Sequence, residues 1–378
     1  MQINHDEQIL PPQTIGIIGG GQLGRMMSIA AKYMGYEVIV LDPTPNCPTA
    51  QVADGQIVAA YDDMDAIKKL TEKSDVVTYE FENVDLAAAT YIEEAGKLPQ
   101  GAFALEVTQN REKEKTLMKE AGLPVPTFSI VHNSTECEEA LKNTELPAVI
   151  KTCRGGYDGK GQLKIETEQD VDAAIKFADQ GGTFIIEQWV PFDLEISVVF
   201  TREQNGNIAF FPISENEHKA HILSATIVPA RVSESVKEKA IAAAKVLAEK
   251  INIVGTFAIE MFVKGEDIYI NEMAPRPHNS GHYSIEACNV SQFSQHIRAI
   301  CGLPLNEVQL QNNAIMVNVL GEHMNKALRA LTTLPNAFVH LYGKEEPKEK
   351  RKMGHITFIA DNEEEVFKMR EEYEGDLE

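Results

Sequence analysis

The chain has 378 residues, and its 35 basic side chains against 57 acidic ones leave a formal net charge of −22. So negative a chain is unsuited to general binding of nucleic acid or of anionic membranes, because a polyanion would be repelled. Hydrophobic residues make up 43% and charged residues 24%, which is typical of a globular protein with two or three cores and excludes disorder over most of the chain.

The N-terminal segment and the cysteines indicate where the protein works. MQINHDEQIL has neither the basic nor the apolar region of a secretory signal, and no apolar run reaches the roughly 20 residues of a membrane span. The five cysteines are scattered and contain no CxxC pair, which argues against a disulfide framework or a thiolate zinc site. We therefore expect a cytoplasmic protein that binds neither membrane nor nucleic acid.

The first hundred residues alternate short apolar runs with helical patterns, which predicts βαβ units and an open parallel sheet. Strands are expected at 14–19, 36–42 and 75–81, and helices at 21–34 and 86–97. This part of the chain therefore has the pattern of a Rossmann-like α/β domain.

From about residue 106 the pattern becomes α+β. A charged helix is expected at 108–122, and a second long helix at 234–250 begins with the capping-box spacing of Ser235 and Glu238. The shorter elements expected are a helix at 134–143, strands at 147–151, 162–165, 183–190, 255–263 and 267–273, and three apolar runs followed by an acidic helix in the last eighty residues.

The segment Gly19–Gly24 fits the pattern G-x-G-x-x-G between a strand and a helix, where backbone amides can receive a phosphate. Asp42 ends the second strand, near the place where a dinucleotide fold puts its ribose-binding acid. Three interpretations stay open from these residues: a nicotinamide or flavin site, a different phosphate-bearing ligand, or glycines that only let the loop turn and pack.

A second glycine-rich segment follows the strand that carries Lys151. The loop 154–162 reads RGGYDGKGQ, with four glycines between cations. Glycine lets backbone amides approach a ligand closely, so the lysine and the loop can converge on a triphosphate. The alternative is a solvated surface hairpin.

Glu260 lies on one predicted strand, and Asn271 and Glu272 lie on the next one. If the KGED turn closes an antiparallel hairpin, these side chains are within about one rung of each other. Two carboxylates and an amide oxygen form a hard donor set that suits Mg²⁺, whereas a pair of solvated acids is the alternative.

Directly after this hairpin, the segment APRPHNSGH offers Arg276 as a bidentate partner for a carbonate or phosphate, with His278 and His282 beside it. Near the C-terminus, YGK and RKMGH form a basic island that includes Lys344 and Arg351. In so acidic a chain this island could attract a phosphate ester, or it is a solvated charge run.

Taken in order, GGGQLGRM, TYEFENV, RGGYDGKGQ, NEMAPRPHNSGH and YGK with RKMGH resemble the 5-(carboxyamino)imidazole ribonucleotide synthetases, an ATP-grasp family of de novo purine biosynthesis, over roughly residues 14–360. The resemblance implies that ATP, bicarbonate and aminoimidazole ribonucleotide give the N-carboxylated ribonucleotide, ADP and phosphate. It also implies a homodimer. The implied domains are a Rossmann-like domain at 1–105, an ATP-grasp domain at 106–300 with a lid at about 125–190, and a small β-rich C-terminal domain at 301–378.

The resemblance also implies roles for individual residues. Glu260 and Glu272 would bind Mg²⁺, with Mn²⁺ as an alternative, and Gln22, Leu23, Glu80, Arg276, Lys344 and Arg351 would bind the ribonucleotide. Arg276, Lys160, Asp158 and His278 would act in catalysis. ATP would contact Arg111, Lys151, Gly156, Tyr157, Asp158, Gly159, Lys160, Gly161, Gln162, Glu187, Gln188, Trp189, Val190, Glu195, His218, Asn271 and Glu272.

The implied chemistry forms carboxyphosphate from bicarbonate and the γ-phosphate, and the ribonucleotide amine then attacks it or released CO2. Asp158 and His278 are the two candidates for the general base. The chain departs from the family in Lys160, where the loop commonly has arginine, and this substitution keeps the charge but loses the planar fork.

Three other classes of function fit parts of the sequence: other ATP-grasp ligases, dehydrogenases and nucleotide-binding regulators. Glycinamide ribonucleotide synthetase and biotin carboxylase share the ATP-grasp unit, but the PRPHNSGH and RKMGH motifs favour the present family. A dehydrogenase would account for only the first glycine loop and Asp42. A regulator would bind ATP without turnover.

Overall fold

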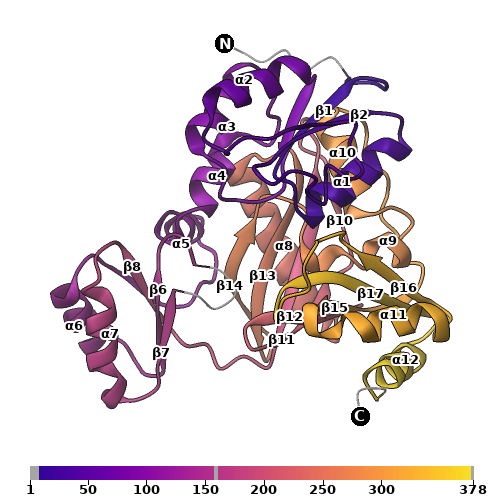
Figure 1. The fold of residues 1–378 in the computed structure, drawn as a ribbon. Helices are drawn as coiled ribbons and strands as arrows, with labels where there is room; N and C mark the ends of the chain where they lie inside the picture. Colours follow the sequence, from indigo (N-terminus) through magenta and orange to yellow (C-terminus); the bar gives the residue numbers. More distant parts are fainter. Residues whose placement is uncertain (1–7, 157–160, 376–378) are drawn as a thin grey trace.

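The structure is a computed structural model that describes residues 8–156 and 161–375. Three sheets organise these residues, with the N-terminal layer at the top of Figure 1, a lid to one side and a long antiparallel sheet in the centre. Within the described ranges, no helix combines the length and apolarity that crossing a bilayer requires. The cysteines are all buried and free, as expected.

The N-terminal sheet is parallel, with strand order β3-β2-β1-β4. Helix α2 begins after Asp63, whose carboxylate accepts hydrogen bonds from the amides of Asp65 and Ala66 and so caps the helix. The parallel strand order with its connecting helices confirms the predicted open α/β layer. Its elements are β1 (Thr14–Ile18), α1 (Gln22–Tyr33), β2 (Glu37–Leu41), β3 (Gly55–Ile57), α2 (Met64–Lys73), β4 (Val76–Tyr79), α3 (Leu86–Glu94) and α4 (Ala102–Thr108).

The lid is a small antiparallel sheet with strand order β5-β8-β6-β7, and helices α6 and α7 pack on it around a core of its own. Helix α5 leads from the N-terminal layer into the lid. Strand β6 carries Lys151 at its end, directly before the glycine-rich loop. The elements are α5 (Arg111–Glu120), β5 (Phe128–Val131), α6 (Ser134–Lys142), β6 (Ala148–Thr152), β7 (Gln162–Ile165), η1 (Glu168–Asp170), α7 (Val171–Ala178) and β8 (Phe184–Gln188).

The central sheet has the order β14-β13-β9-β11-β12-β15-β17-β16, with β10 on β9. Helix α8 packs against β9, β13 and β14 through an alanine-rich face. The elements before the C-terminal strands are β9 (Leu194–Arg202), β10 (Ile208–Phe210), β11 (Ser214–Lys219), β12 (Ile222–Val228), α8 (Glu234–Ile251), β13 (Gly255–Lys264), β14 (Asp267–Ala274), η2 (Asn279–Gly281), α9 (Ser284–Ala287) and α10 (Gln292–Ile300).

The C-terminal strands extend this same sheet, because β15 pairs antiparallel with β12 from Ala225↔Val317 to Val228↔Ala314. Residues on both sides of the predicted domain boundary at 301 therefore share one sheet. Helices α11 and α12 pack on the far end of the sheet around a further core. The elements are β15 (Asn313–Leu320), η3 (Gly321–His323), α11 (Met324–Thr333), β16 (Ala337–Leu341), β17 (Lys352–Ala360) and α12 (Glu363–Gly375).

Two local predictions are corrected. Helix α8 is capped by Ser233, whose hydroxyl accepts from the Val236 amide, so the predicted Ser235 lies inside the first turn. Strand β11 was not predicted, because its sequence SENEHK is polar and carries no apolar alternation. Its neighbours β9 and β12 supply the pairing that its side chains do not indicate.

Candidate active site

A cavity of about 850 Å³ lies where the three sheets meet. Its volume is within the range of pockets that enclose small molecules and cofactors. Residues from the N-terminal layer, the lid and the central sheet all line it, so the cavity exists only when the three parts are assembled. Many of the residues singled out from the sequence share it: Gln22, Leu23, Glu80, Arg111, Lys151, Gly156, Gln162, Glu187, Gln188, Trp189, Val190, Glu195, His218, Glu260, Asn271, Glu272, Arg276 and His278.

The floor of the cavity is the β13–β14 hairpin. The predicted turn is confirmed, since Lys264 pairs with Asp267 and Glu260 lies directly opposite Glu272. The register shifts after Glu260, so that Met261 pairs with Ile270 and Asn271 is the extra residue of a bulge. Strand alternation would send Asn271 and Glu272 to opposite faces, but with this bulge both line the cavity.

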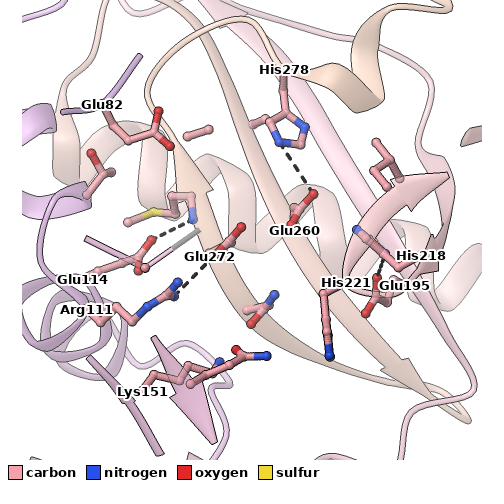
Figure 2. Close-up of a pocket in the computed structure, with 18 of the residues that line it drawn as sticks. Glu82, Arg111, Glu114, Lys151, Glu195, His218, His221, Glu260, Glu272 and His278 are labelled. Carbon is pink, nitrogen blue, oxygen red and sulfur yellow. Dashed lines mark hydrogen bonds and ion pairs between the residues drawn. The ribbon is translucent and has the colours of Figure 1, made fainter. Parts of the chain in front are cut away.

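The two facing carboxylates are electrostatically unequal. Burial, and then repulsion from Glu272, raises the pKa of Glu260 to about 8. Although burial acts in the opposite direction, Arg111 and Lys151 keep the pKa of Glu272 below its usual value, and Arg111 Nη1 lies 3.4 Å from Glu272 Oε2. Figure 2 shows both carboxylates extending into the same space from neighbouring strands.

This oxygen-only pair fits a hard divalent cation, because a cation removes the repulsion that otherwise favours a protonated Glu260. Within residues 8–156 and 161–375, no group of three or more His, Cys, Asp or Glu side chains is arranged to hold a metal. The protein therefore supplies two carboxylates and a neighbouring amide, and a ligand with oxygen donors is needed to complete a coordination shell.

Lys151 and Glu187 form the lid side of the site. Lys151 Nζ lies 2.5 Å from Glu187 Oε2, and the other oxygen of Glu187 is 2.9 Å from Nζ of Lys115. Despite its burial, the two lysines hold the pKa of Glu187 far below the usual value for a carboxyl. The Glu187 side chain is therefore engaged by cations, so only the backbone of this residue is left to contact a base.

Apolar side chains that the sequence analysis did not single out form one wall of the cavity. Phe192 and Phe262 stack with centroids 4.6 Å apart, and Val149 lines the cavity together with the predicted residues Trp189 and Val190. A planar base fits such a surface. Neither phenylalanine stands in a polar motif, so no sequence signal distinguished them from core residues.

Glu195 and His218 meet across neighbouring strands β9 and β11, with His218 Nδ1 in contact with a carboxylate oxygen of Glu195. Burial lowers and Glu195 raises the pKa of His218, with a net increase. Both side chains line the cavity beside His221, a further histidine that the sequence analysis did not single out (Figure 2). This face is therefore suited to hydroxyl and phosphate groups.

Arg276 reaches the cavity but is not free to move. Glu82 of the TYEFENV segment accepts from Nε at 2.6 Å and from Nη2 at 2.9 Å, and the Pro277 carbonyl accepts from Nη1 at 3.2 Å. Near it, His278 Nε2 lies 3.7 Å from Glu260 Oε1, while Nδ1 bonds Ser280. Burial, and then Arg276, holds the pKa of His278 well below its usual value, so this ring is neutral.

Carboxylates of the protein accept hydrogen bonds from three amides of the first glycine loop. Glu80 accepts from the amides of Gly21 and Gly24, the latter at 2.8 Å, and Asp42 accepts from the amide of Gly20 at 2.7 Å. The same Asp42 oxygen accepts from Tyr61. These contacts argue against the nicotinamide interpretation, since three amides of the loop and the expected ribose-binding acid are already hydrogen-bonded within the protein.

The basic island packs beside this loop. The Gly343 carbonyl accepts from Gln51, which in turn accepts from Arg25 in helix α1. Lys344 donates to the Lys352 carbonyl at 2.7 Å, and burial, followed by Arg351, lowers the pKa of Lys344 to about 8. Neither Lys344 nor Arg351 lines the cavity, whereas Lys352 does.

Some predicted residues cannot be placed. Tyr157, Asp158, Gly159 and Lys160 lie outside the described residues, so the predicted roles of Asp158 and Lys160 stay predictions. On either side of them, Gly156 and Gln162 line the cavity, and Gly161 has a positive φ of 71° with its carbonyl accepting from Thr152. Glycine alone adopts this conformation without strain.

The fold and the cavity define the class. Models of a ribonucleotide synthetase preATP-grasp domain, an ATP-grasp domain and a phosphoribosylaminoimidazole carboxylase C-terminal domain match residues 12–109, 116–293 and 314–369. The chain is thus an ATP-grasp enzyme. It is 49% identical over 358 residues to an N5-carboxyaminoimidazole ribonucleotide synthase of Bacillus subtilis (strain 168), and the aligned residues cover 94% of each chain.

Solved structures agree. A crystal structure of the ADP complex of an N5-carboxyaminoimidazole ribonucleotide synthetase superposes with a TM-score of 0.95 at 53% identity and covers 98% of each chain. The Aspergillus clavatus enzyme in complex with ADP and 5-aminoimidazole ribonucleotide gives 0.89 at 29% identity, covering 96% of this chain and 98% of that one. The chain therefore belongs to the N5-carboxyaminoimidazole ribonucleotide synthase family, which confirms the resemblance found in its motifs.

Proposed function

We propose that this protein carboxylates 5-aminoimidazole ribonucleotide with bicarbonate and ATP, giving 5-(carboxyamino)imidazole ribonucleotide, ADP and phosphate in purine biosynthesis. The observation that carries the proposal is that one cavity joins Lys151 and the Glu260–Glu272 pair to Glu80 and Gln22 of the N-terminal layer. A nucleotide at the first end and a ribonucleotide at the second would bring their reacting groups together between them. The names of the relatives in this family support the same reaction.

ATP would lie between the lid and the hairpin. Its base would stack in the apolar wall of Phe192 and Phe262, its ribose hydroxyls would reach Glu195, and its phosphates would meet Lys151 and Arg111. Gly156 and Gln162 of the loop, together with His218 and the hinge residues up to Val190, complete the proposed set in the cavity lining, and Gly161 would turn the loop toward it.

Glu260 and Glu272 would hold Mg²⁺, or Mn²⁺ in its place, with Asn271 beside them. When bound, the cation would supply positive charge that offsets the charge developing on the transferred group. Arg111 keeps Glu272 ionised, and binding of the cation would remove the proton from Glu260.

Bicarbonate would attack the γ-phosphorus through one oxygen, and the carboxyphosphate formed would meet the ribonucleotide amine in the same enclosed space. Arg276 would steady the carbonate anion, because Glu82 fixes the plane of its guanidinium. Of the two candidates for the base that takes the amine proton, His278 is the weaker, because its Nδ1 accepts from the Ser280 amide and the neutral ring therefore carries its own proton on Nε2. Asp158 stays the second candidate for this base.

The ribonucleotide would occupy the N-terminal end of the cavity, next to Gln22, Leu23 and Glu80. Lys344 and Arg351 would receive its 5′-phosphate from the basic island. We further propose that the protein is a homodimer, as in the family that it resembles. A cytoplasmic location follows from its charged phosphorylated substrates, which do not cross membranes unaided.

The test measures ADP release from Mg-ATP in degassed buffer, with aminoimidazole ribonucleotide and bicarbonate each added or omitted. We expect ADP formation that requires the ribonucleotide and a carboxylated product that requires bicarbonate. ATP binding without turnover under all four conditions would contradict the proposal, and turnover with a different amine acceptor would replace its substrate.

A further inference from the structure

A buried lysine outside the cavity links the lid to the hairpin. Lys115 lies on helix α5 and is completely inaccessible to solvent. Its ammonium group donates to the carbonyls of Ile270 at 3.1 Å and Asn271 at 2.7 Å. It also pairs with Oε1 of Glu187 at 2.9 Å, off the line of a hydrogen bond.

This set of contacts is more than charge neutralisation. A buried ammonium needs an opposite charge, and Glu187 supplies it. The two hydrogen bonds to backbone carbonyls have a further effect, because they attach Lys115 to the peptide groups before and after the bulge residue Asn271. The residues that line the cavity do not include Lys115, so it does not contact a bound ligand there.

Glu187 continues the link toward the phosphate site. Its second oxygen holds Lys151 Nζ at 2.5 Å. Two lysines thus share one carboxylate. One of the two positive charges therefore remains to attract an anionic ligand. Without Lys115, both oxygens of Glu187 could turn to Lys151 and compete with phosphate for it.

Helix α5 makes two further contacts with the same strand. Glu114 accepts from the Met273 amide at 2.7 Å, and Arg111 contacts Glu272. Positions 111, 114 and 115 lie on one face of a helix, so the three side chains hold consecutive residues of β14. The helix is therefore in contact with both halves of the nucleotide site.

We propose that Lys115 is a positioning residue that holds the lid hinge at Glu187 in register with the bulge at Asn271, so that Lys151 and Glu272 meet the same triphosphate. The inference rests on the proposed ATP site but extends to a residue that touches no substrate. A misplacement of about 1 Å at a reacting centre is enough to lower a rate by roughly 100-fold.

The experiment compares Lys115→Met, which keeps the length of the side chain and removes its charge, with Lys113→Met. Lys113 is on the same helix, but its side chain is 44% exposed and pairs with Glu106 at the surface. The readouts are Mg-ADP affinity by calorimetry, the Mg²⁺ concentration for half-maximal ADP release, and the KM for aminoimidazole ribonucleotide.

For Lys115→Met we expect Mg-ADP affinity to fall by about tenfold or more, the half-maximal Mg²⁺ concentration to rise, and kcat to fall by roughly 30- to 100-fold. The KM for the ribonucleotide should stay within twofold of the Lys113→Met value, because that substrate binds at the other end of the cavity. A general folding defect would change both substrates together. Unchanged Mg-ADP affinity and Mg²⁺ dependence would overturn the proposal.

If Lys115→Met does not fold, Lys115→Met/Glu187→Gln removes both buried charges and is compared with Glu187→Gln. The contacts with the carbonyls of Ile270 and Asn271 are then lost only in the double variant, so its half-maximal Mg²⁺ concentration should be about threefold to tenfold higher. Equal values would overturn the proposal. Because calorimetry with Mg-ADP needs no turnover, a wild-type protein inactive with the ribonucleotide would refute the proposed function and still leave Lys115 tested.

Discussion

Two groups of carboxylates have different surroundings, one beside the first glycine loop and the other on the hairpin that forms the floor of the cavity. Glu80 and Asp42 accept hydrogen bonds from the amides of the first glycine loop, which offset part of the cost of their burial, although burial still raises the pKa of Glu80. Glu260 and Glu272 instead face each other across a strand pair, and Glu260 has a pKa of about 8 as a result of burial and that repulsion.

The comparison shows that backbone donors position an acid without a ligand, whereas two acids that face each other repel unless a cation offsets their charge. Backbone amides complete the glycine-loop end without any ligand, which explains why the dinucleotide fingerprint is present without a dinucleotide site. The hairpin end needs a cation to relieve its repulsion. Substitutions at the two ends should therefore have opposite effects on stability.

The largest expected effect is on turnover. Glu272→Gln should reduce ADP release by about 100-fold or more, because one charged ligand of the proposed cation is lost together with the partner of Arg111. Steady-state assays at saturating Mg-ATP measure it. Glu238→Gln, an exposed carboxylate on α8, is the matched control. Magnesium-dependent turnover within threefold of that control would count against the metal site.

Glu260→Gln should stabilise the protein in the absence of Mg²⁺ at pH 8, by on the order of 2 kcal/mol. The raised pKa means that the folded protein holds a proton which the unfolded chain releases above its own pKa of about 4.5. The stability this gives is present at low pH and is lost as the pH rises toward 8. The amide variant avoids that loss.

Urea unfolding at pH 5 and pH 8 provides the measurement for Glu260→Gln. Glu114, whose pKa burial raises to about 7, contributes a similar trend to both proteins and cancels in their difference. The difference in unfolding free energy between Glu260→Gln and the wild type should shrink at pH 5, and it should disappear when Mg-ADP is added to the wild type. An advantage that is independent of pH would refute the electrostatic explanation.

At the other end, Glu80→Gln should destabilise the protein by about 1 to 3 kcal/mol, since an uncharged acceptor is weaker for the amides of Gly21 and Gly24. Unfolding curves for this variant and for Glu37→Gln, an exposed acid on β2, give the comparison. Equal stabilities would show that the two carboxylate groups are less different than their contacts indicate.

The smallest effect concerns the basic island. Because burial and Arg351 lower the pKa of Lys344 to about 8, its charge is lost as the pH rises above that value. The KM for aminoimidazole ribonucleotide should rise about threefold between pH 7.5 and 9, while the KM for ATP changes little. Lys344→Arg keeps its charge and should flatten this profile. A profile unchanged by Lys344→Arg would place the titrating group elsewhere.

The features that the sequence alone determined are local. A two-residue turn between β13 and β14 fixes the register that brings Glu260 within one rung of Asn271 and Glu272, and glycines after β1 allow the strand-to-helix turn. Asp63 caps α2 through its own neighbours. Short-range hydrogen bonds and strand alternation decide such features, so spacing is enough to predict them.

The tertiary structure decided which of these groups are free. Glu80 reaches the amides of Gly21 and Gly24 from 56 to 59 residues away, and Lys115 reaches Asn271 across 156. The bulge that turns Asn271 into the cavity and the pairing of β12 with β15 likewise join distant segments. Sequence spacing carries no information about such contacts, because they depend on how packed layers meet; only the fold shows which buried charge is left for a ligand.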